Sequence, residues 1–550
     1  MSGVNLPDKK QWGWAALLVL VTVIVYLPAL KAGFIWDDDL LLTDNPRVQS
    51  AGGLQEIWTY SLESEYYPVT WTSFWLEWRL WGMNPKGYHA TNILFHAVGV
   101  LLVWRVLSRL GIRGAWWAAM IFAIHPVNAE SVAWIAERKN TLSLIFYALT
   151  VLAFLRFDGG GKSGWYWGAL ASFLAALLSK ASGVTLPAVL LLCVWWQRNK
   201  IDRRDLLRVA PFFLLAAGAG LLAISTQQWH SASGEALFSV KRPVWFRLGA
   251  AGHAFWFYVG KALVPVNLMA VYPLWKFDKL TPLFWAPTLW VALVTGIVWW
   301  FRATWGRGVL FALLYFGVML VPVLGVFNAP YIGRSPVVTD HLQYLATIGI
   351  ISLVVAGIMS LPRMVGNGLA IVIVGALAIL SAKRATCYEE PVKFWTDTLA
   401  RNPQAARAHY NLGVHYDKLQ RYDEALKHYA ATVQWEPDYY KGHNNMAKVL
   451  IRQGRLADAI GHFEAAARFR PREADLYYNY GLALFLARRF PEAVVELKQA
   501  IRYQPRYVNA HACLAGAYLQ LGKTEEARRH LAEADRLNPN HPDFTRFLPR

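Results

Sequence analysis

The sequence is 550 residues long, and 55% of these residues are hydrophobic, 14% aromatic and 17% charged. So apolar a composition excludes an ordinary soluble protein and predicts an integral membrane protein. The formal net charge of +19 lies mostly in the apolar part of the chain, where Lys and Arg anchor cytoplasmic loops, so we expect no nucleic-acid partner.

The first apolar run, residues 12–30, is about one bilayer thick. Lys9 and Lys10 precede it, and it ends in KAGFIWDDD, which is not a small-residue cleavage site. We therefore expect a retained first membrane span and not a removed signal peptide.

Three consecutive acids, Asp37, Asp38 and Asp39, follow this run within the stretch FIWDDDLLLTDN. Adjacent carboxylates repel one another and raise one another's pKa, so a triplet at the mouth of a span favours a functional role. We predict that Asp37 or Asp38 is a catalytic base. Asp39 is expected to be a hydrogen-bond or metal partner. The sequence does not decide whether the three carboxylates bind a divalent ion.

Apolar segments long enough to span recur along the rest of the membrane part. Basic clusters fall in alternate loops, which places those loops in the cytoplasm and the acidic first loop outside. An odd number of spans then puts the C-terminal region on the same outer side as Asp37. The segment 244–269 contains Arg247, His253 and Lys261, and we expect it to be interfacial or re-entrant. The eleven predicted spans are residues 12–31, 90–108, 114–135, 140–156, 164–180, 182–198, 207–226, 283–301, 309–327, 342–361 and 366–383.

A period of 34 residues begins after Ser381. It is marked by Pro403, Pro437, Pro471, Pro505 and Pro539, and small residues repeat in phase at Gly413, Ala447, Gly481 and Ala515 and at Ala425, Ala459, Ala493 and Ala527. This spacing predicts four tetratricopeptide repeats, in which small residues let paired helices approach closely. We expect a superhelix with a concave face for a partner chain.

If the substrate is attached to a lipid, reactive residues must gather where spans emerge on the outer side. The candidate polar residues outside the acidic triplet are His125, Asn128, Glu130, Glu137, Arg138, Lys139, Lys180, Tyr272, Arg334, Asp340, His341 and Tyr344. Taken singly, most of these have a structural explanation, such as an acid at the noncytoplasmic flank or a snorkelling cation.

Glycosyl transfer from a polyprenyl phosphate is a reaction that such a group supports. A carboxylate accepts the proton of the attacking hydroxyl. The leaving lipid phosphate gains charge and needs cations at headgroup depth, for which Arg138, Lys139 and Lys180 are the candidates. A single displacement would invert the anomeric centre.

Four blocks of the sequence resemble the transmembrane and tetratricopeptide-repeat-containing O-mannosyltransferases and their bacterial relatives, which are members of the GT-C superfamily. The blocks are FIWDDDLLLTDNP, YYPVTWTSFWLEWRLWGMNPKGYHATNILFHA, HPVNAESVAWIAERKNTLS and LLSKASG, followed by the repeats.

The resemblance implies an inverting transferase that uses a polyprenyl-phosphate sugar, with its repeats on the same side of the membrane as its active site. The family's acidic pair falls on Asp37 and Asp38. Supporting positions fall on His89, Asn92, His125, Glu130 and Arg138, and we add Tyr272, Asp340 and His341 from the outer-side residues.

Three positions depart from the pattern of that family. Tyr67 replaces the Arg usual before Pro68, Ala181 replaces the acid usual after Lys180, and the later DRYLYLP-like block is DHLQYLA from Asp340 onward. Because of these differences, the resemblance does not identify the sugar or the lipid of the donor.

The sequence therefore predicts an all-α protein: a polytopic GT-C-like bundle of about eleven spans in residues 1–385, with outer loops 32–89 and 327–341, and a repeat superhelix in residues 386–550. We expect a multi-pass protein of the cytoplasmic membrane with periplasmic repeats, or of the endoplasmic reticulum membrane if it is eukaryotic. Its partners would be membrane lipids, a lipid-linked sugar and an exported protein. The alternatives are a noncatalytic scaffold for envelope or surface-appendage assembly, and a transferase that acts on a lipid or a glycan.

Overall fold

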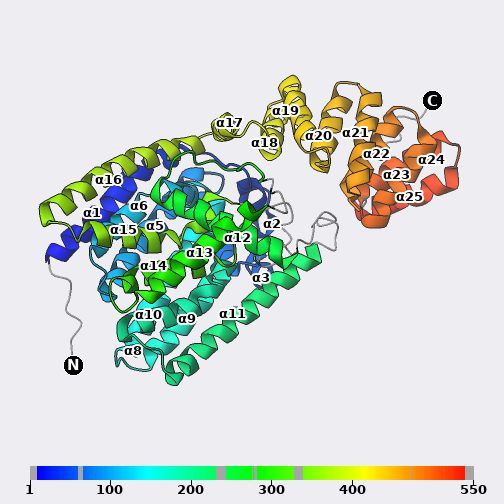
Figure 1. The fold of residues 1–550 in the computed structure, drawn as a ribbon. Helices are drawn as coiled ribbons and strands as arrows, with labels where there is room; N and C mark the ends of the chain where they lie inside the picture. Colours follow the sequence, from blue (N-terminus) through cyan, green and yellow to red (C-terminus); the bar gives the residue numbers. More distant parts are fainter. Residues whose placement is uncertain are drawn as a thin grey trace. The chain divides into compact units, whose positions relative to one another are not determined.

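The computed structural model describes residues 9–59, 66–230, 243–275, 277, 281–326, 338–470 and 472–538, and these residues form helices and turns without a strand (Figure 1). The predicted all-α class is confirmed. The chain divides into two compact units, the first made of Met1–His230 and Phe238–Asp397 and the second containing Thr398–Arg550. Most of the predicted loop 327–341, including Arg334, lies outside the described residues.

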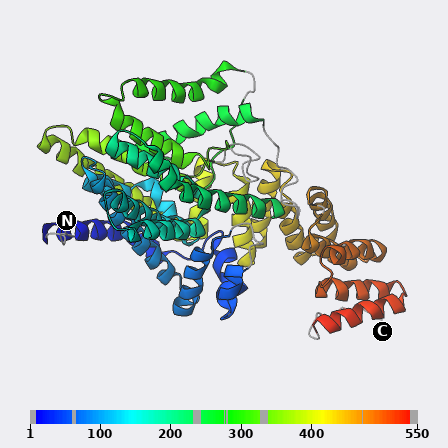
Figure 2. The same ribbon diagram turned by 90° about the horizontal axis from the view of Figure 1, so that it is seen from below.

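Long apolar helices make up most of the first unit, and α8 and α9 pack side by side within it (Figures 1 and 2). Its principal helices are α1 (Lys9–Tyr26), α4 (Pro68–Trp81), α5 (Pro85–Arg109), α6 (Ala115–Ala123), α8 (Arg138–Asp158), α9 (Gly164–Ser179), α10 (Leu186–Arg198), α11 (Arg203–His230), α12 (Val244–Leu263), α13 (Pro282–Trp300), α14 (Gly306–Leu320), α15 (Thr347–Ile358) and α16 (Arg363–Ala385). Shorter helices are α2 (Pro46–Gln49), α3 (Gly53–Thr59) and α17 (Pro391–Arg401).

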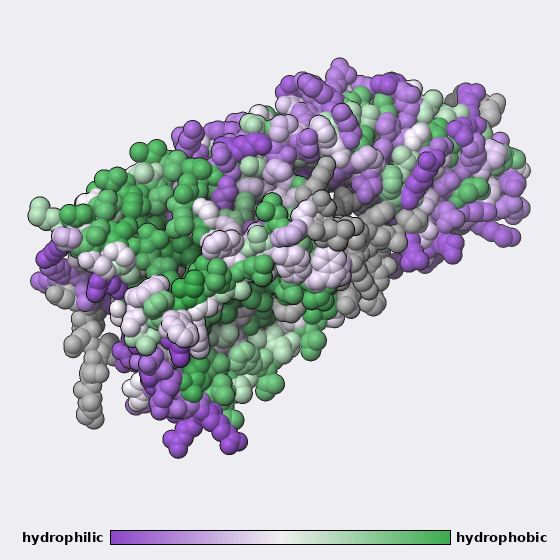
Figure 3. Space-filling model, in the orientation of Figure 1, coloured by the Kyte–Doolittle hydropathy of each residue, from purple (hydrophilic) through white to green (hydrophobic). Residues whose placement is uncertain are grey.

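Six helical segments among the described residues are long and apolar enough to cross a membrane, and three shorter helices are also apolar. Large apolar side chains on α16, such as Ile371, Val372 and Ile379, are exposed, as expected of a surface that faces lipid. The visible face of the first unit is largely hydrophobic in Figure 3, whereas the second unit is mostly hydrophilic. These features indicate a multi-pass membrane protein. The number of eleven spans stays a prediction, as does the interfacial position of α12.

The predicted span 114–135 differs from the observed structure. Helix α6 ends at Ala123, and the chain continues through three short helices, η3 (Pro126–Asn128), α7 (Ala129–Ala133) and η4 (Ile135–Glu137). Pro126 has no amide hydrogen to continue the helix, and every residue from 118 to 138 is buried. Irregular backbone is tolerated at such a place because the surrounding protein, not lipid, covers it.

The second unit stacks four helix pairs. They are α18 (Ala406–Lys418) with α19 (Tyr422–Trp435), α20 (Tyr440–Arg452) with α21 (Leu456–Phe469), α22 (Ala474–Leu486) with α23 (Phe490–Tyr503), and α24 (Val508–Gln520) with α25 (Thr524–Leu537). The predicted small positions lie where the two helices of a pair meet. A Cβ added to Gly413 would lie 2.6 Å from the Tyr429 ring, and one added to Gly481 would lie 2.6 Å from Leu497 Cγ.

We expect Gly481→Val to lower the free energy of unfolding of the repeats by about 1–3 kcal/mol, because the branched side chain overlaps Leu497 and the backbone behind it. Gly461 is the matched control: it also lies within a helix, but nothing lies within 4 Å of an added Cβ. Gly461→Val should therefore change the free energy of unfolding by only about a few tenths of a kcal/mol, which is the difference in helix propensity between Gly and Val. Denaturant unfolding followed by circular dichroism measures both, and equal effects would contradict the packing argument.

Candidate active site

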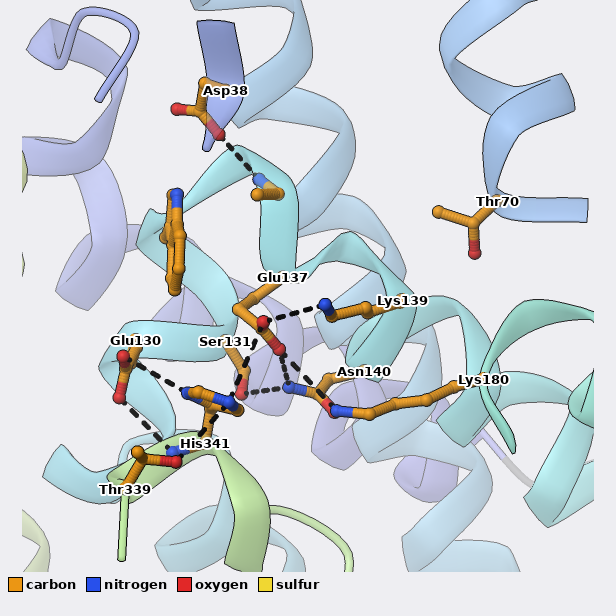
Figure 4. Close-up of polar contacts among 12 residues, drawn as sticks. Asp38, Thr70, Glu130, Ser131, Glu137, Lys139, Asn140, Lys180, Thr339 and His341 are labelled. Carbon is orange, nitrogen blue, oxygen red and sulfur yellow. Dashed lines mark hydrogen bonds and ion pairs between the residues drawn. The ribbon is translucent and has the colours of Figure 1, made fainter. Parts of the chain in front are cut away.

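Glu137 lies at the centre of a buried group of charged side chains in the first unit (Figure 4). It ends the short helix η4, directly before α8. Its carboxylate lies 3.3 Å from Lys139 Nζ, 3.6 Å from Lys180 Nζ and 3.8 Å from His341 Nε2. Three groups that can be cationic therefore surround one carboxylate.

Asn140 connects two members of this group. Its side-chain amide donates to Glu137 at 2.6 Å and to the Ser131 hydroxyl at 3.0 Å, while its carbonyl oxygen accepts from Lys180 Nζ at 2.6 Å. Lys180 follows α9, and the Thr70 hydroxyl of α4 donates to the carbonyl of the preceding residue, Ser179, at 2.9 Å. The end of α9 is thus fixed against α4, which holds Lys180 over Asn140.

His341 connects this group to a second carboxylate, Glu130. Its Nδ1 lies 3.2 Å from Glu130, and its backbone N–H donates to the other oxygen of Glu130 at 3.3 Å. Burial alone would lower the pKa of His341, but the carboxylates of Glu137 and Glu130 outweigh burial and raise it. The imidazolium form of His341 is therefore favoured.

Asp340 precedes His341 and occupies a neighbouring polar position. Burial, reinforced by Glu130, raises the pKa of Asp340 although Arg384 opposes the shift. The Tyr272 hydroxyl donates to one oxygen of Asp340 at 2.8 Å. The structure thus brings together Glu130, Tyr272, Asp340 and His341, four of the residues predicted from the sequence.

The acidic triplet does not act as one group. Asp38 is fully buried, and its two oxygens accept the backbone N–H groups of Ile35 at 2.9 Å and Ala136 at 2.8 Å. Asp37 is exposed, and Asp39 is half-buried at the start of η2 (Asp39–Thr43). Burial raises the pKa of Asp38 well above its usual range, although the two amide hydrogen bonds oppose the shift.

A strained residue holds the loop that presents Asp37 and Asp38. Trp36 has φ +52°, a conformation that costs a bulky residue free energy and persists only when its surroundings require it. Its ring stacks on Trp134 with the centroids 4.6 Å apart and also contacts Trp395. The acidic loop is therefore fixed at two points to the segment that ends in Glu137.

Arg138 is fully buried and faces away from this group of charges. Its guanidinium forms an ion pair with Glu77, and it donates to Asn92 at 2.7 Å and to the Tyr88 carbonyl at 2.9 Å. The predicted phosphate ligands are thus divided. Lys139 and Lys180 lie together at Glu137, with side chains 17% and 11% exposed, whereas Arg138 is enclosed by α4 and α5.

The remaining predicted positions lie in the packing around these groups. His89 Nε2 lies 3.4 Å from the Gly33 carbonyl, and Asn92 donates to the Trp134 carbonyl at 3.1 Å. His125 Nε2 lies 3.1 Å from the Ala262 carbonyl. Each therefore connects two segments through a backbone group.

The described residues contain no group of three or more His, Cys, Asp or Glu side chains arranged to hold a metal ion. Both oxygens of Asp38 already accept amide hydrogens, and a divalent ion bound by the acidic triplet stays a prediction.

The sequence patterns predicted no role for Glu77, Ser131 and Asn140, and they predicted Glu137 only as one of the outer-side residues. Glu137 and Asn140 are three residues apart at the start of an apolar helix, which places them on one face; this spacing is a signal that was available. Glu77 gave no such signal, because its partner Arg138 is distant in the sequence.

Two family models described as tetratricopeptide repeat match the C-terminal part of the chain, one over residues 394–438 and 444–497 and the other over residues 484–548. The predicted repeats are confirmed. A solved structure of the protein MamA, 18% identical, aligns with a TM-score of 0.26 over 27% of this chain and 81% of that chain.

The chain is also similar to proteins named protein O-mannosyl-transferases, as the sequence predicted. Tmtc1 of Drosophila melanogaster is 32% identical over 34% of this chain, and TMTC3 of Homo sapiens is 29% identical over 34% of this chain. The chain spans about a quarter of the length of these relatives, 23% of the fly protein and 22% of the human one.

Arg138→Leu should destabilise the first unit by about 3–5 kcal/mol, because it leaves the Glu77 carboxylate buried without its counter-charge. The double variant Arg138→Leu with Glu77→Leu should recover most of that loss. Thermal unfolding of the purified protein in detergent measures the two changes. Purely additive losses would show that the ion pair is not the source of the effect.

The pH dependence of Asp38 gives a second test. A carboxyl whose folded-state pKa is raised contributes stability that is greatest at low pH and is lost as the pH rises through the folded-state pKa. The stability of the native protein relative to Asp38→Asn should therefore increase as the pH falls from mildly alkaline to mildly acidic. A difference that stays constant over this range would contradict the raised pKa.

Proposed function

We propose that this protein is a membrane glycosyltransferase that moves a sugar from a polyprenyl-phosphate donor to a hydroxyl group of an exported protein. The observation that supports this most directly is the hydrogen bond from Ala136 N–H to Asp38. It joins the acidic loop to the residue just before Glu137, so the acidic loop lies close to the cationic side chains around Glu137. The names of the similar proteins agree with this class of reaction.

The donor phosphate is proposed to bind at Lys139 and Lys180. Both ammonium groups lie beside Glu137, and His341 adds positive charge at the same carboxylate. In a buried site such charges stabilise a growing negative charge more strongly than they would in water. Arg138 is proposed to support this arrangement by fixing α4 and α5 against α8, without touching the phosphate.

The lipid tail is proposed to occupy an apolar groove that reaches Ala181, the residue after Lys180. A cavity of about 280 Å³ lies between α9 and α11 and is lined by residues that include Tyr67, Leu177, Ala181, Leu214, Gly218 and Leu222. Ala181 follows Lys180 directly in the chain. An isoprenoid chain in this groove would bring its phosphate to the lysines.

The chemical step is a single displacement. The acceptor hydroxyl oxygen attacks the anomeric carbon, its proton passes to a carboxylate, and the bond from that carbon to the phosphate oxygen breaks. The electron pair stays on the phosphate, where Lys139 and Lys180 stabilise it. We assign the base role to Asp37, which is exposed, and give Asp38 the role of holding the loop.

The acceptor is proposed to be an exported polypeptide bound by the tetratricopeptide repeats, which are suited to binding a peptide or a protein on a concave surface. In a bacterium the protein would lie in the cytoplasmic membrane with periplasmic repeats. In a eukaryotic cell it would lie in the endoplasmic reticulum membrane.

Asp37→Asn should lower sugar transfer to exported proteins by about 10²–10⁴-fold, which is the usual contribution of a positioned base. Asp44→Asn is the matched control, because it removes the same charge from an exposed residue of the same loop and should leave transfer unchanged. Intact mass analysis of exported proteins from cells with each variant measures the result. Full transfer with Asp37→Asn would exclude it as the base, and absence of any sugar with the native protein would favour the noncatalytic scaffold.

Lys180→Gln tests the donor site separately. It should lower transfer by about 10²–10³-fold, as expected for one lost donor to a developing oxyanion, while Lys162→Gln, in the loop between α8 and α9, should have no effect. The readout is the same mass analysis. Equal effects of the two changes would contradict a phosphate site at Lys180.

A further inference from the structure

Three pairs of histidines recur at the same place in the repeat unit. The first member of each pair lies in the first helix of a repeat and the second in the following helix: His409 with His428, His443 with His462, and His511 with His530. The two Nδ1 atoms are 3.0 Å apart in each pair. Three separate repeats therefore hold two imidazoles in one geometry.

The orientation of the first ring in each pair is fixed by a backbone carbonyl. Nε2 of His409 lies 3.1 Å from the Pro403 carbonyl. The equivalent atoms of His443 and His511 lie 3.0 Å from the carbonyls of Pro437 and Pro505. A carbonyl oxygen accepts only, so Nε2 must carry the proton and Nδ1 must present its lone pair to the second histidine. Metal-ligating histidines are commonly held in this way, with the other ring N–H bonded to a carbonyl.

The second ring is also suited to giving up its Nδ1 proton to a metal. Within an ion-free pair, its Nδ1–H donates to the first ring. Moving its proton from Nδ1 to Nε2 exposes a second lone pair without changing the net charge of the pair.

We propose that each of these histidine pairs binds a divalent transition-metal ion of the zinc type between its two Nδ1 atoms. Imidazole nitrogen is a preferred ligand of Zn²⁺, Cu²⁺ and Ni²⁺. Zn–N bonds of about 2.0–2.1 Å in a tetrahedral arrangement place two ligand nitrogens about 3.3 Å apart, so the rings need to separate by only a few tenths of an ångström. The described residues contain no group of three or more protein ligands, and water completes the coordination.

The third repeat is a natural control for these sites. A shift of 34 residues from His443 and His462 leads to Tyr477 and Glu496. Both histidines are replaced together, so this repeat has the same helices without the pair of imidazoles. The ion would join the two helices of the first, second and fourth repeats, and the third would depend on side-chain packing alone.

Equilibrium dialysis of the full-length protein in detergent, without a histidine tag and after chelator treatment, against Zn²⁺ measures the sites directly. We expect three ions per chain, one for each pair. His428→Phe, His462→Phe and His530→Phe should each remove one ion and keep an aromatic ring in place. A stoichiometry that the triple variant does not change would overturn the proposal, as would the absence of bound zinc.

A gain-of-site variant keeps the test decisive if a phenylalanine variant fails to fold. Tyr477→His combined with Glu496→His should add one ion to the third repeat, whereas Tyr477→His alone should add none. Substituting Co²⁺ for Zn²⁺ gives visible absorption that should increase with the added site. A double variant that binds no more metal than the native protein would contradict the proposal.

Discussion

The burial of the Asp38 carboxylate is the constraint on which the rest of the site depends. Its two oxygens satisfy amide hydrogens of two separate segments, at Ile35 and at Ala136. Those amides would otherwise be buried without partners, which is costly in a dry interior. The acidic loop and the buried turn before α8 are therefore held in one relation to each other, and Glu137 follows directly from that turn.

The charged groups around this link are paired with one another and are largely buried. Glu137 and Glu130 face Lys139, Lys180 and His341, and Arg138 faces Glu77 behind them. Removing ions from water is expensive, so such groups persist only when they are paired or when they serve a function. The Arg138 pair is complete without a ligand. The Glu137 group has more cationic than anionic members nearby, which suits an anionic substrate.

Part of this arrangement was predictable from the sequence. Apolar runs predicted the long helices, the 34-residue spacing predicted four repeats, and the polar blocks after the spans predicted that Glu130, Asp340 and His341 belong to one region. The buried broken helices between Pro126 and Glu137 were not predictable by hydropathy, because a buried segment and a lipid-facing one are equally apolar. The exposure of Asp37 and the burial of Asp38 were also not predictable from the sequence, because they depend on contacts between segments that are distant in the sequence.

The position of Trp395 changes where the two units should be separated experimentally. A boundary drawn where the apolar spans end, after Ala385, would remove the ring that contacts Trp36 and would separate Arg384 from its partner Asp397, 2.7 Å away. Helix α17 supplies the two rings, Phe394 and Trp395, that contact Trp36 at the start of the acidic loop. A fragment of the membrane unit should therefore end at Asp397 or later, so that the strained conformation of Trp36 keeps the neighbours that sustain it.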